Sequence, residues 1–331
     1  MQELFNTFFF IIKGSIINEI NYGVKQMVRV EDLHTFINGN FVTDKDAVIP
    51  IHDGGFTRGD AVFDTCRTFR GEIYKLEEHI DRLFMSLKYM QINSPYTKDE
   101  LIKFTHRLLE LNNPLLTEKD DYWIFLRITR GSSSNYSSGG APNVIIHCVP
   151  LPLPERSEYY RSGLPLMISS VRRTSHEALS PRAKVNQYIN FNLADLEAQN
   201  YQGGAKAILL DQNGNLTEGS GTNIFIVKNN QIFTPQEKFV LAGIGRSDAM
   251  NLAKGLGMPV KEKDLDSYDA FTADEMFVTS TSFCIVPVGS INGREIGDGD
   301  IPGKITKRLQ EAFIDAIGFD YVSQYLSNLD T

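Results

Sequence analysis

The stretch from Ala183 to Phe225 most constrains what this chain can fold into. It begins with a lysine, Lys184, followed by a segment with helical character. Two apolar runs come next, separated by the turn residues Asp211-Gln-Asn-Gly-Asn, and Glu218 lies just before the second run. This order predicts a compact helix–strand–turn–strand unit. A lysine at one end and a glutamate at the other suit a flat cofactor that needs an amine at one edge and a carboxylate at the opposite edge.

Length, charge and cysteine content exclude several classes of protein. The chain has 331 residues, which suits two domains, and its net charge of −8 argues against nucleic-acid binding. The three cysteines, Cys66, Cys148 and Cys284, are too sparse for a disulfide framework and lack zinc-site spacing. We therefore expect a cytoplasmic protein with buried thiols and with neither a nucleic acid nor a membrane as partner.

The first 26 residues differ from the rest of the chain. The run Leu4–Ile12 is apolar but far shorter than a membrane span, and no clear signal-peptide pattern surrounds it. We predict that residues 1–26 form an N-terminal extension outside the fold, with a second possible start at Met27. The alternative is a helix that covers a surface groove.

Residues 27–148 show the pattern of a small α/β domain. Asn38-Gly39 predicts a hairpin turn between two apolar runs. Thr97 and Glu100 predict a capping box at the start of a helix. The predicted strands are Asp60–Phe69, Trp123–Thr129 and Asn143–Val149, the predicted helices are Glu77–Met90 and Lys98–Leu111, and the loop Gly131–Gly140 is expected to be flexible.

The segment 149–155 predicts a domain boundary, because its alternating prolines are expected to forbid a helix and to form a stiff linker. Residues 156–331 then form a larger second domain with mixed elements, so the fold class is α+β. Its predicted strands are Leu166–Val171, Ala207–Leu210, Asn223–Val227 and Glu275–Thr279, and its predicted helices are Gln187–Asn200, Arg246–Gly255 and Ile305–Ala316.

Lys184 and Glu218 each have a structural and a functional interpretation. A lone lysine is usually a surface charge, but Lys184 follows a proline-containing turn and precedes a helix. A buried lysine has a lowered pKa and can form a Schiff base. A glutamate in a turn is usually solvated, but the glycines beside Glu218 allow a ligand to approach the backbone closely. A carboxylate there would keep a pyridine nitrogen protonated.

Two other segments are candidate anion sites. Gly243-Ile-Gly-Arg246 opens a helix, and Thr279-Ser-Thr-Ser282 ends a strand, so both offer backbone N–H groups or hydroxyls. Arg82 is predicted on the helix face opposite the apolar stripe, where it is either a solvated charge or a cation for the same anion. The pattern alone favours the solvated charge.

Arg67 and Arg127 lie inside otherwise apolar strands of the small domain. Phe63 and Arg67 share one strand face at a period of two, and Phe125 and Arg127 share another. A buried arginine needs a partner, so the pair either converges on a substrate carboxylate or forms structural ion pairs. The six histidines show no metal-ligand spacing, so no metal site is predicted.

Taken together, these motifs resemble the class IV, fold-type IV pyridoxal-phosphate aminotransferases. The resemblance runs from Phe36 to about Phe313 and is strongest at three motifs in the family's order: Glu78–Leu83, Leu216–Phe225 and Leu241–Arg246. It implies a two-domain fold like that of D-amino-acid aminotransferase, a homodimer, and pyridoxal 5'-phosphate (PLP) as cofactor.

The resemblance also implies roles for individual residues. Lys184 corresponds to the Schiff-base lysine and Glu218 to the partner of the pyridine nitrogen. The phosphate would be held by Arg82, Ile244, Gly245 and Thr281, with Ser280 and Ser282 nearby. Three positions depart from the frequent family pattern: Gly245 replaces a threonine, Cys284 replaces a glutamate, and Tyr188 lies four rather than five residues after the lysine.

The subfamily depends on the first domain. Phe63, Arg67, Phe125 and Arg127 resemble the branched-chain pattern around a substrate carboxylate, and the loop Ser132–Ser138 lacks the arginine and histidine typical of D-amino-acid enzymes. Val171-Arg-Arg-Thr and Pro181–Tyr188 lean instead towards (R)-amine transaminases. We give more weight to the strands that face the substrate.

The sequence thus predicts a branched-chain amino acid transaminase that transfers the amino group to 2-oxoglutarate or another 2-oxo acid in ping-pong order. The alternatives are an (R)-amine or D-amino-acid transaminase, an aminodeoxychorismate lyase, and a non-catalytic protein that kept the fold. The sequence fixes neither the side chain nor the hand of the substrate.

Overall fold

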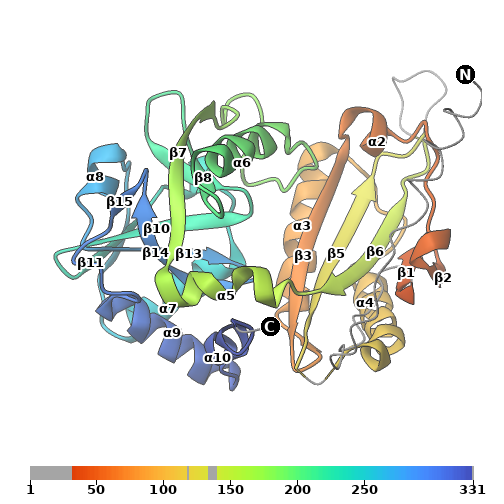
Figure 1. Cartoon of the computed structure of the whole chain (residues 1–331). Coiled ribbons are helices and arrows are strands. Elements are labelled where there is room, and N and C mark those ends of the chain that lie inside the picture. The colour runs from red at the N-terminus through yellow and green to blue at the C-terminus, as the bar shows by residue number, and fades with distance from the viewer. Residues whose placement is uncertain (1–31, 118, 133–139, 330–331) are drawn as a thin grey trace, which may run out of the picture.

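The first of two sheets is built from antiparallel strands. The computed structural model describes residues 32–117, 119–132 and 140–329. Its six-stranded sheet has the order β2-β1-β6-β5-β3-β4 (Figure 1). The bounds are β1 His34–Ile37, β2 Asn40–Thr43, β3 Ala61–Phe69, β4 Glu72–Ile73, β5 Tyr122–Thr129 and β6 Val144–Pro150. The predicted hairpin at Asn38-Gly39 joins β1 to β2, and both residues have positive φ, as this turn requires.

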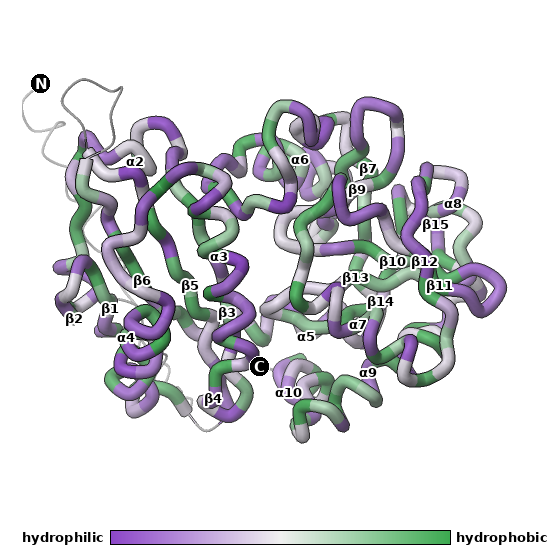
Figure 2. The backbone as a smooth tube through the Cα atoms, turned by 180° about the vertical axis from the view of Figure 1, so that it is seen from behind, coloured by the Kyte–Doolittle hydropathy of each residue, from purple (hydrophilic) through white to green (hydrophobic). Residues whose placement is uncertain are grey.

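Two long helices pack against this sheet. They are α3, Leu76–Met90, and α4, Lys98–Asn112, and the short α2, Gly54–Arg58, precedes β3. The capping box of Thr97 and Glu100 starts α4 as predicted. In Figure 2, α4 alternates between hydrophilic and hydrophobic positions, as a helix with one buried face does. One core, which includes Phe36, Leu83 and Ile124, fills the space between the helices and the sheet.

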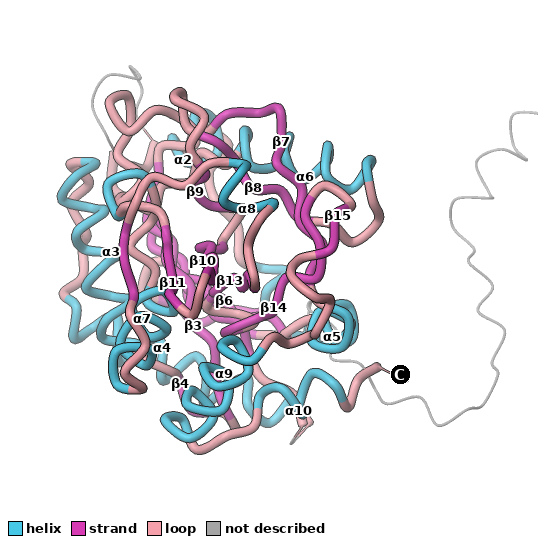
Figure 3. Tube along the Cα trace, turned by 90° about the vertical axis from the view of Figure 1, so that its left-hand side faces the viewer, coloured by secondary structure: helices cyan, strands magenta, loops and turns pink. Residues whose placement is uncertain are grey.

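The second sheet has nine strands and closes on itself, because β9 pairs with both β8 and β10. Figure 3 shows these strands curving around one another. The bounds are β7 Leu164–Arg172, β8 Lys206–Leu210, β9 Leu216–Gly219, β10 Thr222–Lys228, β11 Gln231–Thr234, β12 Val260–Glu262, β13 Glu275–Ser280, β14 Cys284–Ile291 and β15 Arg294–Glu295. Helices surround it: α5 Leu153–Ser162, α6 Ile189–Tyr201, α7 Ile244–Gly255, α8 Ser267–Phe271, α9 Lys304–Ile317 and α10 Tyr321–Leu326.

The segment between the sheets differs from the predicted linker. Residues 149 and 150 end β6, and α5 already begins at Leu153, so the expectation that prolines forbid a helix here was wrong. Pro154 lies in the first turn of α5, where its missing N–H is not needed. We still propose a division into a small domain of 27–148 and a large domain of 156–331, with residues 1–26 outside the described ranges.

The two proposed domains interlock. Ala183 and Val185 pack into the core beneath the six-stranded sheet, and Val62 forms a bridge with Val185. In return, Phe69 at the end of β3 packs into the core of the large sheet. The segment around Lys184 is therefore attached to the small domain, although the chain reaches it through the large one.

Within residues 32–117, 119–132 and 140–329, none of the helices has both the length and the apolar character needed to cross a membrane.

Candidate functional site

A cavity of ≈ 450 Å³ lies between the two sheets. Strands β3 and β5 form one wall, and β9, β13 and the start of α7 contribute to the other. Most predicted site residues line it: Phe63, Arg82, Phe125, Arg127, Lys184, Tyr188, Glu218, Ile244, Gly245, Ser280, Thr281 and Ser282. Arg67 does not line it. Lys184 and Glu218, which are far apart in the stretch Ala183–Phe225, thus face one space.

Lys184 is held by backbone contacts with the small domain. Its N–H donates to Ser86 Oγ at 3.0 Å, and its carbonyl accepts from the N–H of Phe63 at 3.0 Å. The side chain is only 6% exposed. Its Nζ lies 3.3 Å from Tyr188 Oη and 4.5 Å from the centre of the Phe63 ring. The amine is therefore fixed at its base and its end faces the cavity.

Glu218 forms the opposite wall and is also buried. Its Oε1 accepts from Arg173 Nε at 3.1 Å, and its Oε2 accepts from the N–H of Leu241 at 2.9 Å. Burial raises the pKa of Glu218, while Arg173 and the Leu241 N–H oppose that rise. A buried carboxylate with a raised pKa can share a proton with a basic nitrogen placed beside it.

The two predicted anion sites lie next to each other. A Cβ added to Gly245, in the first turn of α7, would lie 3.6 Å from the carbonyl oxygen of Ser280. Gly243 is the N-cap of α7, and a Cβ there would lie 2.1 Å from Asn223 Oδ1, so a side chain at this position would have to displace the Asn223 amide. The free N–H groups at the start of α7 and the hydroxyls of Ser280–Ser282 therefore face one region, which suits an anion.

Arg82 is buried, so the interpretation that the sequence pattern alone favoured, a solvated charge, was wrong. It is 5% exposed. Its Nε and Nη2 donate to Asp64 at 2.8 Å each, and its Nη1 donates to the carbonyl of Ala242, just before α7, at 3.0 Å. Burial alone would raise the pKa of Asp64, but Arg82 and His79 hold it well below its usual range. The buried partner Asp64 explains why a charged residue occupies this face.

Arg127 differs from the other guanidinium groups of the cavity. Arg82, Arg173 and Arg246 each pair with an acid, respectively Asp64, Glu218 and Glu262. Within the described ranges, Arg127 makes no ion pair with the chain, and its buried Nε has no hydrogen-bond partner. Burial lowers the pKa of Arg127. Its guanidinium lies 5.5 Å from the centre of the Phe63 ring, which also contacts Lys184.

The prediction that Arg67 and Arg127 converge on one carboxylate was wrong for Arg67. Arg67 is 1% exposed, and its donors reach Thr68, the backbone carbonyl of Ser282, Cys284 and Gln324. It shares a strand face with Phe63 and Thr65, but it lies one step further along β3, beyond the end of the cavity. The structural interpretation therefore holds for this arginine.

Sequence reasoning missed three residues that hold the site together: Asp64, Ser86 and Arg173. Asp64 carries a signal, since an acid inside an apolar strand needs a partner. Arg173 was noted only as part of a subfamily motif. Nothing in the sequence marks Ser86, because its bond to the N–H of Lys184 joins residues 98 positions apart.

The donor set of the cavity fits PLP. Lys184 supplies an amine, Glu218 a carboxylate on another wall, and Arg82 with the start of α7 a site for a phosphate. Thr279 Oγ1 and Arg246 Nε are buried in the cavity wall without a hydrogen-bond partner in the described chain. Orphaned donors of this kind are rare in native proteins unless a ligand or water satisfies them.

Comparison with known proteins identifies the family. Residues 61–291 match the family described as amino-transferase class IV. The putative branched-chain-amino-acid aminotransferase of Methanocaldococcus jannaschii is 40% identical over 284 residues, which cover 85% of this chain and 95% of that protein.

Solved structures agree with this match. The branched-chain amino acid aminotransferase of Escherichia coli superposes with a TM-score of 0.80 at 29% identity, covering 86% of this chain and 94% of that chain. The T.th. branched-chain amino acid aminotransferase, complexed with N-(5'-phosphopyridoxyl)-L-glutamate, has a TM-score of 0.77 at 26% identity, covering 88% and 96%.

The fold and the cavity thus define a PLP-dependent transferase of fold-type IV, and the predicted α+β class is confirmed. The chain belongs to the class IV aminotransferase family.

Proposed function

We propose that this enzyme transfers the amino group of a branched-chain L-amino acid to 2-oxoglutarate or another 2-oxo acid. The observation that carries the proposal is Arg127, which has no acid partner within the described residues and lies beside the same Phe63 ring as Lys184. A partly buried cation without an acid beside it favours a substrate that brings its own carboxylate. A simple amine would leave Arg127 unpaired, so the arrangement favours an amino acid over an (R)-amine.

The walls near Arg127 support an apolar side chain. Phe63, Trp123, Phe125, Tyr188 and Phe191 all line the cavity. Aromatic and apolar walls with a few polar groups are typical of sites for small apolar ligands. The relative from Methanocaldococcus jannaschii and the solved structure from Escherichia coli both carry the name branched-chain aminotransferase, which points in the same direction.

The predicted cofactor-binding residues each have a role in this reaction. Arg82, Ile244, Gly245 and Thr281, with Ser280 and Ser282 beside them, bind the phosphate of PLP. Glu218 binds the ring nitrogen and holds a proton there, as its raised pKa allows. Tyr188 lies within hydrogen-bond distance of Lys184 Nζ and orients it. Bound PLP supplies the electron sink that stabilises negative charge at the substrate Cα.

Lys184 then serves two purposes. With PLP bound, Lys184 would hold the cofactor through its Nζ amine, and that amine, when free, would take the proton from the substrate Cα. Arg127 orients the substrate by its carboxylate. The donor leaves as a 2-oxo acid while its amino group stays in the site, and a second 2-oxo acid accepts that group in ping-pong order.

A half-reaction screen tests the assignment. Purified enzyme is mixed separately with L-leucine, L-glutamate, D-alanine and (R)-1-phenylethylamine, and the cofactor absorbance is followed. We expect a response to the L-amino acids alone. A response only to D-alanine or the amine overturns the substrate proposal, and pyruvate release without an added acceptor indicates a lyase. Borohydride reduction followed by peptide mapping must place the label on Lys184.

We also propose a homodimer, in the cytoplasm. Exposed apolar side chains line one face of α6, where Ile189 is 69%, Leu193 50% and Leu196 56% exposed, and Phe56 in α2 is 68% exposed. Exposed apolar patches of this kind mark interaction surfaces. Leu193→Lys should shift the sedimentation coefficient from dimer to monomer, and an unchanged value would count against this surface.

The proposed cytoplasmic location is supported by the cysteines, which are free and buried, as a reducing compartment permits.

A further inference from the structure

The turn 281–283, which connects β13 to β14, is held from the side that faces away from the cavity. Thr281 and Ser282 line the cavity. Behind them, the carbonyl of Ser282 accepts two hydrogen bonds, from Arg67 Nη1 at 3.0 Å and from Tyr325 Oη at 2.6 Å. The neighbouring carbonyl of Phe283 accepts from Tyr160 Oη. These hydrogen bonds restrict the backbone conformation of the turn.

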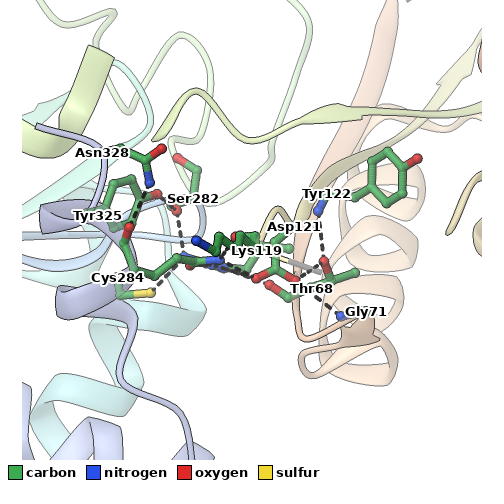
Figure 4. A network of polar contacts seen from close by, with 11 residues as sticks. Thr68, Gly71, Lys119, Asp121, Tyr122, Ser282, Cys284, Tyr325 and Asn328 are labelled. Atoms are coloured by element: carbon green, nitrogen blue, oxygen red, sulfur yellow. Dashed lines mark hydrogen bonds and ion pairs between the residues drawn. The ribbon is translucent and has the colours of Figure 1, made fainter. Parts of the chain in front are cut away.

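Arg67 is itself immobilised by the small domain. Its Nε donates to the carbonyl of Thr68 at 3.0 Å, and its Nη2 lies 3.7 Å from Asp121 Oδ2. Asp121 is fixed in turn by Thr68 and by the N–H of Gly71. Gln324 of α10 accepts from Arg67 and donates to Asp121, which closes the network. Figure 4 shows Asp121 and Thr68 on the small-domain side and Ser282 and Tyr325 on the other.

This network joins the two walls of the cavity. Phe63 and Thr65, on the same strand as Arg67, form one wall, and Thr281 and Ser282 belong to the other. Arg156 adds a second tie, because its Nη1 donates to Ser282 Oγ at 2.6 Å while its guanidinium lies 5.1 Å from the Trp123 ring. The spacing of the walls therefore depends on contacts to Ser282.

We propose that Arg67 is a positioning residue of the transamination site, which sets the turn 281–283 for the cofactor phosphate by holding the carbonyl of Ser282. A peptide unit is planar, so fixing this carbonyl also fixes the adjoining N–H and limits the neighbouring peptide units. Preorganised donors bind an anion more tightly than donors that must first be ordered. The inference rests on the proposed role of Thr281 and Ser282 in binding the phosphate.

A purely stabilising role would have a different signature. A buried ion pair often contributes little net stability, because desolvation offsets attraction. A residue that acts only on stability lowers the unfolding temperature and leaves the affinity for cofactor unchanged. A positioning residue changes the affinity for the cofactor in folded protein.

Three variants separate these roles. Arg67→Met removes every donor and keeps similar volume, and Arg67→Lys restores the charge with a different reach. Tyr325→Phe keeps Arg67 and removes one hydrogen bond to the same carbonyl. The control is Tyr74→Phe: Tyr74 Oη donates to Asp248 at 3.1 Å, a contact between the same two domains that does not touch the turn.

The experiment measures the Kd of the apoenzyme for PLP by fluorescence titration, the competition of inorganic phosphate, KM and kcat for each substrate, and the unfolding temperature. We expect Arg67→Met to raise the Kd for PLP about tenfold or more and Tyr325→Phe to raise it about threefold or more, as expected for lost hydrogen bonds. Arg67→Lys should fall between Arg67→Met and wild type. Tyr74→Phe should lower the unfolding temperature as Tyr325→Phe does and keep the Kd within about twofold.

The outcomes distinguish this inference from the proposed function. The positioning role alone would be overturned if the Kd for PLP were the same in Tyr325→Phe, Arg67→Met and Tyr74→Phe while their unfolding temperatures were lowered. If Arg67→Met fails to fold, Tyr325→Phe against Tyr74→Phe decides the question. If wild-type protein binds no PLP, or reduction labels a residue other than Lys184, the proposed function itself fails.

Discussion

Arg82 and Arg127 are two arginines of one cavity with opposite surroundings. Arg82 donates twice to the fully buried Asp64 and once to a backbone carbonyl, so the protein itself fixes its orientation. Arg127 has an orphaned Nε and no acid partner in the described chain. The first arrangement suits a cofactor that stays bound through many turnovers, and the second suits a substrate that comes and goes. We therefore propose that the arginine with an acid partner in the protein, Arg82, holds the cofactor, and that Arg127 holds the substrate.

Asp64→Asn should produce the largest effect, because it leaves the buried Arg82 without its acid partner. Removing one partner of a buried ion pair costs about 3–5 kcal/mol, since the other charge stays buried. The free energy of unfolding in urea, measured on apoenzyme, should fall by that amount. Asp60→Asn is the control: Asp60 pairs with Arg130 at 2.6 Å, but the two side chains are 22% and 27% exposed. It should cost about 1 kcal/mol or less, and equal losses for both variants would contradict the contrast.

Arg127→Met should leave stability unchanged or improve it, because no partner in the described chain is lost. Its effect should appear in substrate binding. A hydrogen bond to a charged group contributes about 1.5–3 kcal/mol, so KM for L-leucine should rise about 10- to 100-fold. The Kd for PLP should stay near the wild-type value. A drop in the free energy of unfolding comparable to that of Asp64→Asn would show that Arg127 is a structural residue as well.

The pair of Arg82 and Asp64 also predicts that the free energy of unfolding depends on pH. Because Arg82 and His79 depress the pKa of Asp64 in the folded protein, its contribution to stability is fully present above the ordinary value of 3.8 and is lost as the pH falls through the lower, folded value. Within that acid window, the wild type should lose about 1.4 kcal/mol per pH unit that Asp64→Asn does not lose. Unfolding curves at several pH values would reveal a constant difference if Asp64 were not ionised.

Some features of the fold and of the site can be predicted from the sequence, and others cannot. Local signals identify the Asn38-Gly39 hairpin, the capping box of α4, and the lysine and glutamate of the site. The pattern favoured a solvated Arg82, because no local signal shows its buried partner Asp64, which lies on a strand 18 residues earlier. A period of two puts Arg67 on the same face as Phe63 but does not say where the cavity ends. Positions of this kind depend on how elements pack, which short-range patterns do not contain.

Tyr188 lines the cavity between the region of Arg82 and the region of Arg127, and its substitution should give the smallest effect. Its hydroxyl lies 3.3 Å from Lys184 Nζ, a long hydrogen bond, so Tyr188→Phe should cost about 0.5–1 kcal/mol, which raises the Kd for PLP about two- to fivefold. The control is Tyr122→Phe, which removes a 2.6 Å bond to the carbonyl of Asn112 inside the small-domain core. That variant should lose stability and keep its affinity for PLP. If Tyr188→Phe instead leaves the affinity for PLP unchanged and raises KM, then Tyr188 belongs with Arg127 to the region that contacts the substrate.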